Sequence, residues 1–226
     1  MTTLPFDAVF FDMDGTLVNT EPYWLEAEKS LMDEFGAEWT LEDQAYCLGG
    51  PLSKMANYMW EKSGRSGAPE YFEAECVKRV AALFSQGVNF MPGAFELLEE
   101  LYALEIPMAL VSASPRILVE STAAMLKKEY FVTTIGSEDV TQTKPSPEGY
   151  LLAAQRLNVQ IERSLIFEDS HTGIAAAQAS GAGVIAIPHL NAIAEEGRTR
   201  TVNSLSGMNV ADIARLYIPQ INGGVN

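Results

Sequence analysis

The chain has 226 residues, of which 47% are hydrophobic and 20% charged, a composition typical of a folded globular protein rather than a disordered one. Its 15 Lys and Arg against 30 Asp and Glu give a formal net charge of −15, which argues against nucleic acid or an anionic membrane as a partner. A small phosphorylated substrate held at one local positive site is compatible with this balance. Cys47 and Cys76 are too few for a disulfide framework, and no Cys or His spacing predicts a zinc site.

No segment of the sequence has the features of a secretion signal or a membrane span. Residues 1–7 lack a basic stretch and an apolar run, and the apolar runs elsewhere are far shorter than the ~20 residues that a membrane-spanning helix needs. We therefore expect a cytoplasmic protein without a membrane partner. These features do not bear on its oligomeric state.

Short apolar runs alternate with helical segments along most of the chain. Continuous apolar runs predict buried strands at 8–11, 108–111, 165–167 and 184–187, with a weaker one at 132–135. Runs of this kind suit strands that are covered on both faces, as in parallel sheets. Helical spacing of leucines follows Ala94, and serines before helical segments suggest caps at Ser146, with Pro147 as first helical residue, and at Ser170. The alternation predicts a doubly wound α/β fold with a mostly parallel sheet.

The segment from about Thr20 to Gly87 breaks this alternation because no strand is predicted in it. Three stretches with helical spacing, 24–35, 52–59 and 71–84, are separated by Gly and Pro residues. We interpret this segment as an inserted helical domain whose Met and Trp residues pack inside it. The predicted domains are therefore a helical insert at 20–87 and an α/β core formed by 1–19 and 88–226.

Two acidic pairs follow predicted strands. Asp12 and Asp14 lie two residues apart on extended backbone, so their side chains point the same way, and Gly15 permits a sharp turn after them. Glu168 and Asp169 follow another buried strand. In isolation the first pair could be two solvated loop acids, but if the two strands are neighbours, as many as four acids meet at the sheet edge where ligands bind. Such oxygen ligands suit Mg²⁺.

Two further polar residues lie at the same kind of position. Ser112 ends a predicted strand, where a hydroxyl beside the free amides of a helix start can hold a phosphate oxygen. Lys144 precedes a predicted helix, and its ammonium group would offset the charge of nearby acids and of a phosphoryl group. Each signal is weak alone, because serine-rich turns and surface lysines are common.

In this order the four motifs resemble those of the haloacid dehalogenase superfamily of phosphotransferases: Asp12-Met13-Asp14-Gly15-Thr16, Ser112, Lys144 and Glu168-Asp169. The helical insert is similar to the cap of the β-phosphoglucomutase-like subfamily. The resemblance implies a Rossmann-like sheet in which the first strand is flanked by the second and the fourth.

The resemblance also implies a role for each motif. Asp12 would be the nucleophile that forms an aspartyl-phosphate, and Asp14 the general acid and base. Mg²⁺ would be held by Asp12, the carbonyl of Asp14, Glu168 and Asp169. Ser112, Ala113 and Lys144 would bind the transferring phosphoryl group.

Departures from the subfamily pattern bear on substrate. Sugar phosphomutases have a histidine where this chain has Trp24, and an arginine in the cap where it offers Lys54 close to Gly50. Hydrolysis is therefore favoured over mutase activity. Trp24, Gly50, Lys54 and Arg116 are the candidate substrate contacts. We predict a Mg²⁺-dependent phosphatase of small phosphomonoesters such as sugar phosphates; the alternatives are a phosphomutase and a phospholigand-binding regulator without turnover.

Overall fold

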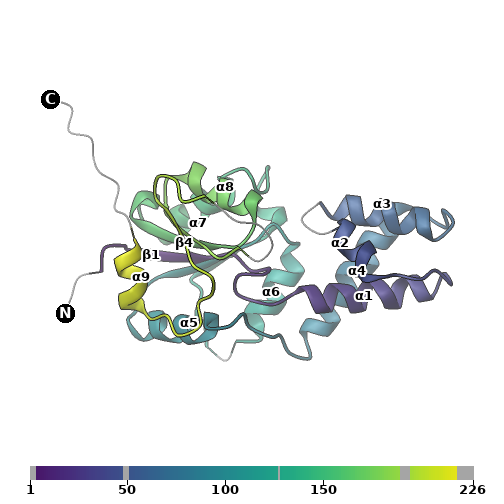
Figure 1. Ribbon diagram of the computed structural model, residues 1–226, viewed down its shortest axis with the longest axis horizontal. Helices are drawn as coiled ribbons and strands as arrows, with labels where there is room; N and C mark the ends of the chain where they lie inside the picture. The colour runs from purple at the N-terminus through teal and green to yellow at the C-terminus, as the bar shows by residue number, and fades with distance from the viewer. Residues whose placement is uncertain (1–3, 48–50, 127, 189–193, 218–226) are drawn as a thin grey trace. The chain divides into compact units, whose positions relative to one another are not determined.

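The computed structural model describes residues 4–47, 51–126, 128–188 and 194–217. The chain divides into two compact units, one formed by residues 1–19 and 89–226 and the other by residues 20–88 (Figure 1). The first unit is an α/β layer structure, and the second is helical throughout its described part.

The α/β unit contains a parallel sheet with the strand order β3-β2-β1-β4-β5-β6. Its strands are β1 (Ala8–Phe11), β2 (Met108–Val111), β3 (Thr133–Ile135), β4 (Ser164–Glu168), β5 (Gly183–Ala186) and β6 (Thr199–Thr201). Every neighbouring pair is parallel, and β1 lies between β2 and β4 as the family resemblance implies. The predicted doubly wound α/β fold is confirmed.

Helices cover both faces of this sheet. The elements are α5 (Ala94–Ala103), α6 (Arg116–Ala124), α7 (Glu148–Leu157), α8 (His171–Ser180), α9 (Val210–Leu216) and two short 3₁₀ helices, η1 (Ser137–Asp139) and η2 (Ile161–Arg163). Figure 1 shows α7 and α8 on one face and α5 and α6 on the other. The chain runs outward from β1 to β2 and β3, then crosses back to β4, so the strand order reverses between β1 and β4, and ligands bind at such switch points.

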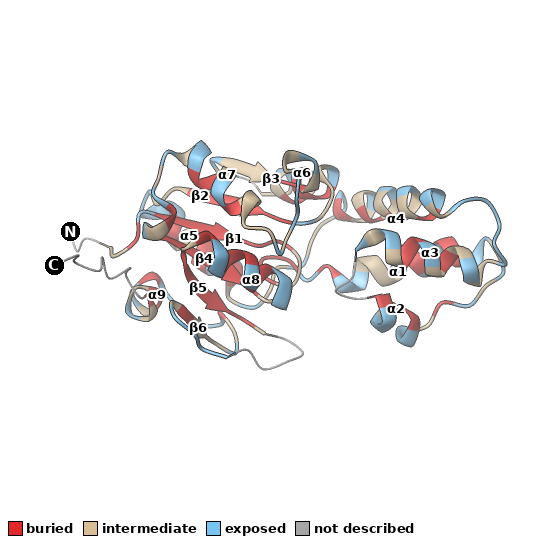
Figure 2. Ribbon diagram, turned by 90° about the horizontal axis from the view of Figure 1, so that it is seen from above, coloured by how far each residue is buried: buried red, intermediate tan, exposed pale blue. Residues whose placement is uncertain are grey.

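The core follows the two-residue period of the strands. Phe10, Ala109 and Ile166 point to one face, where they pack with Tyr150 of α7 and Ala176 of α8. Alternate residues of the same strands fill the other face, and the four central strands are buried along their whole length (Figure 2). Burial on both faces explains why these strands read as continuous apolar runs.

Two details of the α/β unit differ from the sequence expectations, and one agrees with them. Strand β6 was not predicted, because it has only three residues and they are Thr-Arg-Thr. Helix α7 begins at Glu148, one residue after the expected Pro147. The expected cap of α8 is confirmed, because the Ser170 hydroxyl accepts a hydrogen bond from the Gly173 amide. Gly181 ends this helix in the left-handed conformation.

The helical unit contains α1 (Glu21–Asp33), α2 (Leu41–Cys47), α3 (Leu52–Lys62) and α4 (Pro69–Phe84). Its core joins Met59 of α3 to Phe72 and Cys76 of α4 and to Met32 of α1, as the interpretation of these residues as internal packing requires. The short helix α2 was not predicted. Cys47 and Cys76 are free buried thiols in this core.

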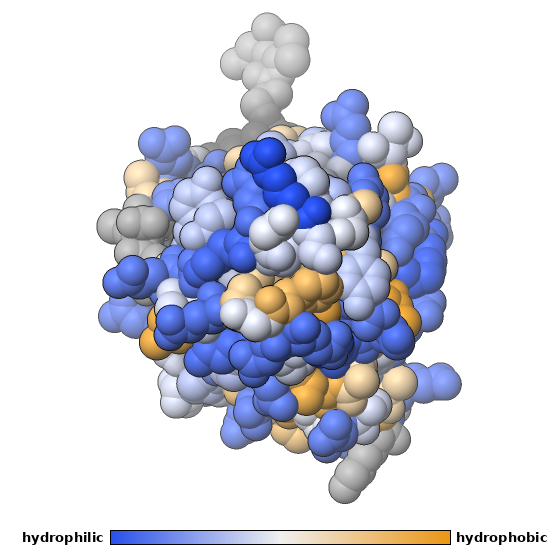
Figure 3. All heavy atoms as spheres, turned by 90° about the vertical axis from the view of Figure 1, so that its right-hand side faces the viewer, coloured by the Kyte–Doolittle hydropathy of each residue, from blue (hydrophilic) through white to orange (hydrophobic). Residues whose placement is uncertain are grey.

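The face in Figure 3 is mostly hydrophilic, with hydrophobic side chains in separate small patches. Among the described residues, no helix combines the length and the apolar character that a membrane crossing needs.

Candidate active site

Three polar residues, Asp12, Ser112 and Glu168, lie where strands of the α/β unit end. Asp12 directly follows β1, and its amide donates to the Phe167 carbonyl at 3.0 Å, so the pairing of β1 with β4 continues up to the site. Ser112 follows β2 and is held in the same way by the Ile135 carbonyl of β3. Glu168 is the last residue of β4. Side chains far apart in the sequence therefore meet at the carboxyl edge of the sheet.

Lys144 connects the first and last of these motifs. Its ammonium group donates to the Asp12 carboxylate, to Glu168 Oε1 at 2.5 Å and to the Val111 carbonyl at 3.0 Å. Only 8% of the Lys144 side chain is exposed. Burial disfavours the charged ammonium, but the carboxylates of Asp12 and Glu168 outweigh this effect and raise the pKa of Lys144. Lys144 is thus a buried cation and not a surface lysine.

The carboxylate of Glu168 is fully buried and held by several donors. Oε1 accepts from Lys144 and from the Tyr150 hydroxyl at 2.8 Å, and Oε2 accepts from the Asp169 amide and from Ser170. The first turn of α8 passes directly over this group, because a Cβ on Gly173 would lie 1.9 Å from Oε1. Sequence reasoning missed Tyr150, whose position in α7 looks like that of an ordinary core aromatic.

Three carboxylates form a candidate metal centre. One ligand oxygen from each of Asp12, Glu168 and Asp169 lies within 4.8 Å of the others. Burial, and next the charge of Glu168, raise the pKa of Asp12 well above its ordinary value. Among the described residues, Lys144 is the one cation that contacts both Asp12 and Glu168. The three acids together therefore form an oxygen-rich set that fits a divalent cation such as Mg²⁺.

The loop after β1 brings Asp169 into this group. Gly15 has φ +82°, and a Cβ there would lie 2.3 Å from Asp169 Oδ2, so only glycine allows the loop to approach so closely. The next residue, Thr16, donates from its hydroxyl to Asp169 Oδ1 at 3.2 Å. The Asp-x-Asp-Gly-Thr motif is therefore tied to the Glu-Asp motif by direct contact.

The Asp14 side chain has separate partners. Its Oδ2 accepts hydrogen bonds from the Ser112 hydroxyl at 2.9 Å and from the Ser114 hydroxyl at 2.7 Å. Its Oδ1 is buried and, among the described residues, has no hydrogen-bond partner. Asp14 is thus outside the cluster of three carboxylates, and its carboxylate offers one free oxygen. Ser114 is a second residue that sequence reasoning missed; its serine-rich turn carried no distinct signal.

The remaining predicted residues lie elsewhere. Ala113 is exposed beside Ser112. Arg116 starts α6 and is paired with the buried carboxylate of Asp139 at 2.5 Å, which gives it a structural partner.

Two other predicted residues belong to the helical unit. Trp24 packs against its core, and Lys54 donates to the Tyr46 carbonyl at 2.5 Å near the end of α2. Gly50 lies outside the described residues.

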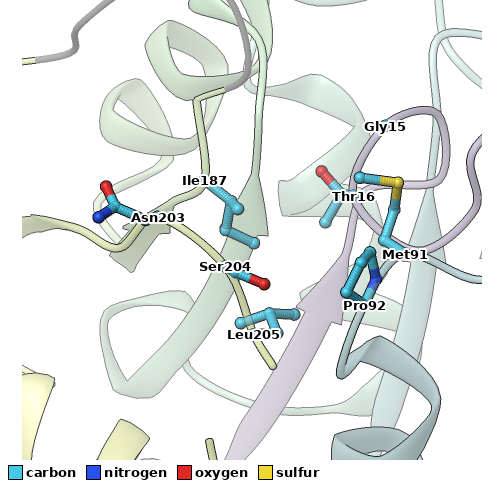
Figure 4. Close-up of a pocket in the computed structure, with 8 residues that line it drawn as sticks. All are labelled: Gly15, Thr16, Met91, Pro92, Ile187, Asn203, Ser204 and Leu205. Atoms are coloured by element: carbon cyan, nitrogen blue, oxygen red, sulfur yellow. The ribbon is translucent and has the colours of Figure 1, made fainter. Parts of the chain in front are cut away.

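A small cavity of about 210 Å³ adjoins the loop after β1. Figure 4 shows Thr16 and Met91 on one side of it and Ile187, Asn203 and Ser204 on the other. Its lining is uncharged, so the charged groups described above are not part of it.

A comparison with known protein families matches the part of the chain that contains these site residues. The sequence model of the haloacid dehalogenase-like hydrolases matches residues 9–187, a stretch that contains Asp12, Ser112, Lys144 and Asp169. The chain belongs to the haloacid dehalogenase-like hydrolase family.

Relatives within this family include named phosphatases. A phosphorylated carbohydrates phosphatase of Thermotoga maritima is 32% identical over 77% of this chain and 82% of its own length. The fructose-1-phosphate phosphatase YqaB of Escherichia coli is 28% identical over 78% of this chain and 93% of its own length. The crystal structure of CbbY from Rhodobacter sphaeroides with xylulose-(1,5)bisphosphate matches with a TM-score of 0.76 and 25% identity, covering 92% of this chain and 98% of that chain.

Proposed function

We propose that this chain is a Mg²⁺-dependent phosphatase of small phosphomonoesters, with sugar phosphates as its substrate class. The observation that carries the proposal is the buried Asp12 carboxylate, which contacts Lys144 at the end of β1 within a cluster of three acids. The substrate class is supported by the relatives, two of which are named for phosphorylated carbohydrates and fructose 1-phosphate.

Asp12 is the proposed nucleophile. Attack by one of its oxygens on phosphorus forms an aspartyl-phosphate and breaks the bond to the leaving alcohol, which divides one difficult displacement into two easier ones. A carboxylate repels a phosphate dianion, so the positive charge of Lys144 on Asp12 supports attack. Mg²⁺, when bound by Asp12, Asp169, Glu168 and the Asp14 carbonyl, supplies further neutralisation of the phosphoryl charge.

Asp14 is the proposed general acid and base. Its oxygen without a hydrogen-bond partner is available to hold a proton, while the two serine hydroxyls fix the other oxygen. In the first half-reaction Asp14 gives its proton to the leaving alcohol oxygen. In the second it takes a proton from the water that attacks phosphorus, and the bond between Asp12 and phosphorus breaks. Inorganic phosphate leaves, the Asp12 carboxylate is restored, and Asp14 returns to its starting state.

The phosphoryl group is held by Ser112, the Ala113 amide and Lys144 in this proposal. Lys144 is suited to the task because its ammonium is buried and already oriented by three acceptors. Trp24, Gly50 and Lys54 of the helical unit, and Arg116 of the α/β unit, stay candidates for contacts to the rest of the substrate. Their substitution is expected to change KM for individual sugar phosphates more than kcat for a minimal substrate.

A phosphate-release assay over sugar phosphates, polyol phosphates and nucleotides tests the proposal. We expect phosphate release with Mg²⁺, no release with EDTA, and recovery when Mg²⁺ is restored. Asp12→Asn is the matched control, because it keeps the shape of the side chain. Turnover of sugar phosphates without phosphate release would instead identify a phosphomutase, and no turnover across the panel would leave a binding protein.

A further inference from the structure

Tyr150 is a buried core aromatic whose hydroxyl contacts the candidate active site. It lies in α7, is 1% exposed, and belongs to the apolar cluster between α7, α8 and the sheet. Its hydroxyl donates to Glu168 Oε1 at 2.8 Å, and its ring lies under the Lys144 ammonium at 5.1 Å from the ring centroid. Packing alone explains the ring but not the hydroxyl, since a phenol in an apolar core is costly without a hydrogen-bond partner.

We propose that Tyr150 is a positioning residue for the phosphoryl-transfer reaction, which keeps the Lys144 ammonium on Asp12 by sharing the negative charge of Glu168. This inference rests on the proposed phosphatase function. It adds a residue from the first turn of helix α7 to a site otherwise built from loops and strand ends.

Asp12 and Glu168 compete for one cation, the Lys144 ammonium. Lys144 has two carboxylate partners, Asp12 and Glu168, and both contacts are short. In a buried site, an ammonium between two carboxylates moves toward the one whose negative charge is compensated by fewer other hydrogen-bond donors. The hydroxyl of Tyr150 supplies such compensation at Oε1, the same oxygen that Lys144 contacts.

Removal of the hydroxyl therefore has a defined consequence. Glu168 Oε1 loses one of its two donors and attracts Lys144 more strongly, at the expense of the Asp12 contact. The ring remains to fill the core and to face the ammonium, so the effect falls on the charge distribution and not on the packing.

The experiment compares Tyr150→Phe with the wild-type full chain in steady-state hydrolysis at saturating Mg²⁺. We expect kcat to fall roughly tenfold, the loss that removal of a hydrogen bond to a charged group produces, with KM changed less than about twofold. Tyr102→Phe is the matched control, because Tyr102 is 41% exposed on α5 and belongs to no part of the site; it should leave both constants unchanged. Wild-type kcat in Tyr150→Phe would overturn the proposal.

Calorimetric titration of Mg²⁺ into the free protein separates positioning from packing without relying on activity. We expect Tyr150→Phe to bind Mg²⁺ as tightly as the wild type or more tightly, because the charge of Glu168 is less compensated. A parallel loss of Mg²⁺ affinity, kcat and melting temperature would show that Tyr150 only packs, and would contradict the inference.

A double variant tests whether Tyr150 acts through Glu168. In a Glu168→Gln background, where the charge is gone, Tyr150→Phe should reduce kcat by less than about threefold. An equal tenfold loss in both backgrounds would contradict the inference. If the wild type hydrolyses no phosphomonoester, the proposed function fails; if the wild type is active and Tyr150→Phe is equally active, only this inference fails.

Discussion

Both units of the protein bury carboxylates, but they neutralise them differently. In the helical unit Asp43 accepts from the Thr40 amide and hydroxyl, from the Tyr58 hydroxyl at 2.7 Å and from Lys62 at 2.5 Å. In the α/β unit Asp12 and Glu168 share one lysine, and Asp169 adds a third carboxylate within 4.8 Å. The pKa of Asp43 is accordingly held below its ordinary range despite partial burial, whereas that of Asp12 is raised by burial and by its acidic neighbours.

The difference that matters is the number of acids that share one cation, because burial alone also raises the pKa of Glu28 in the helical unit. The hydrogen-bond donors around Asp43 compensate its negative charge, so this carboxylate stabilises the fold around α2. The cluster at the sheet edge has more negative charge than its lysine offsets, and such an arrangement costs stability unless a cation binds. We infer that the α/β unit retains these destabilising charges because the candidate active site requires them.

Asp12→Asn should have the largest effect, a loss of phosphatase turnover of roughly 10³-fold or more, because an amide oxygen is a poor nucleophile. The fold should survive, and the melting temperature should stay equal or rise, since one of the crowded charges is gone. Turnover is followed by phosphate release and stability by calorimetry. Near-normal turnover would remove Asp12 as the nucleophile.

Asp14→Asn should slow hydrolysis by roughly 10²- to 10³-fold, because one group serves first as acid and then as base. Both half-reactions should be slow, so rapid-quench measurements should show no initial burst of alcohol release. Ser114→Ala, which removes one of the two donors to Asp14 Oδ2, is the milder companion. A burst in Asp14→Asn would show that only the second half-reaction needs this group.

Glu28→Gln should change the pH dependence of stability in the helical unit. Glu28 is 3% exposed, accepts from the Trp39 indole at 2.8 Å, and has its pKa raised by burial to about 7. A raised pKa in the folded state means that stability is present below the unfolded value of 4.5 and is lost as pH rises through about 7.

The size of this effect follows from the shift. The raised pKa of Glu28 corresponds to a loss of about 3 kcal/mol in the free energy of unfolding at pH 8. Glu28→Gln should restore this free energy, because glutamine stays neutral. Urea unfolding of wild type and Glu28→Gln at pH 5 and pH 8, followed by tryptophan fluorescence, measures it. Parallel pH profiles for the two proteins would show that Glu28 does not ionise in this range.

Asp43→Asn should have the smallest effect, a loss of about 1 kcal/mol in the free energy of unfolding at pH 7, with kcat unchanged. The amide retains one acceptor for Thr40 but loses the ionic contact to Lys62, which is partly exposed to solvent. Lys62→Met, which removes the other partner, is the matched control. A large loss of kcat with unchanged stability would reverse the contrast between the two units.

The central fold could be predicted because its strands are buried on both faces and therefore read as uninterrupted apolar runs. Strand β6 could not, because an edge strand of Thr199, Arg200 and Thr201 has neither length nor an apolar face. Helix α2 was missed for a similar reason: its seven residues place only Asp43 and Cys47 in the interior, which is too little periodicity to detect.

The candidate site residues that could be predicted from the sequence are those that lie at the ends of strands. Asp12, Ser112, Glu168 and Asp169 come directly after apolar runs, and their meeting followed once the strand order was assumed. The network around them was not predictable, because Tyr150 reaches Glu168 from a helix face whose other residues serve the core. Side-chain hydrogen bonds of this kind, such as the one from the Ser114 hydroxyl to Asp14, depend on three-dimensional proximity and leave no pattern in the sequence.

The most direct test of the account is to trap the phosphoenzyme. The wild-type chain is mixed with Mg²⁺ and a substrate carrying radioactive phosphorus, quenched in acid within milliseconds, and digested. We predict label on the peptide that contains Asp12, released by hydroxylamine and absent from Asp12→Asn or from samples with EDTA. Phosphate release in solution with no label on the protein, or label on another residue, would contradict the account.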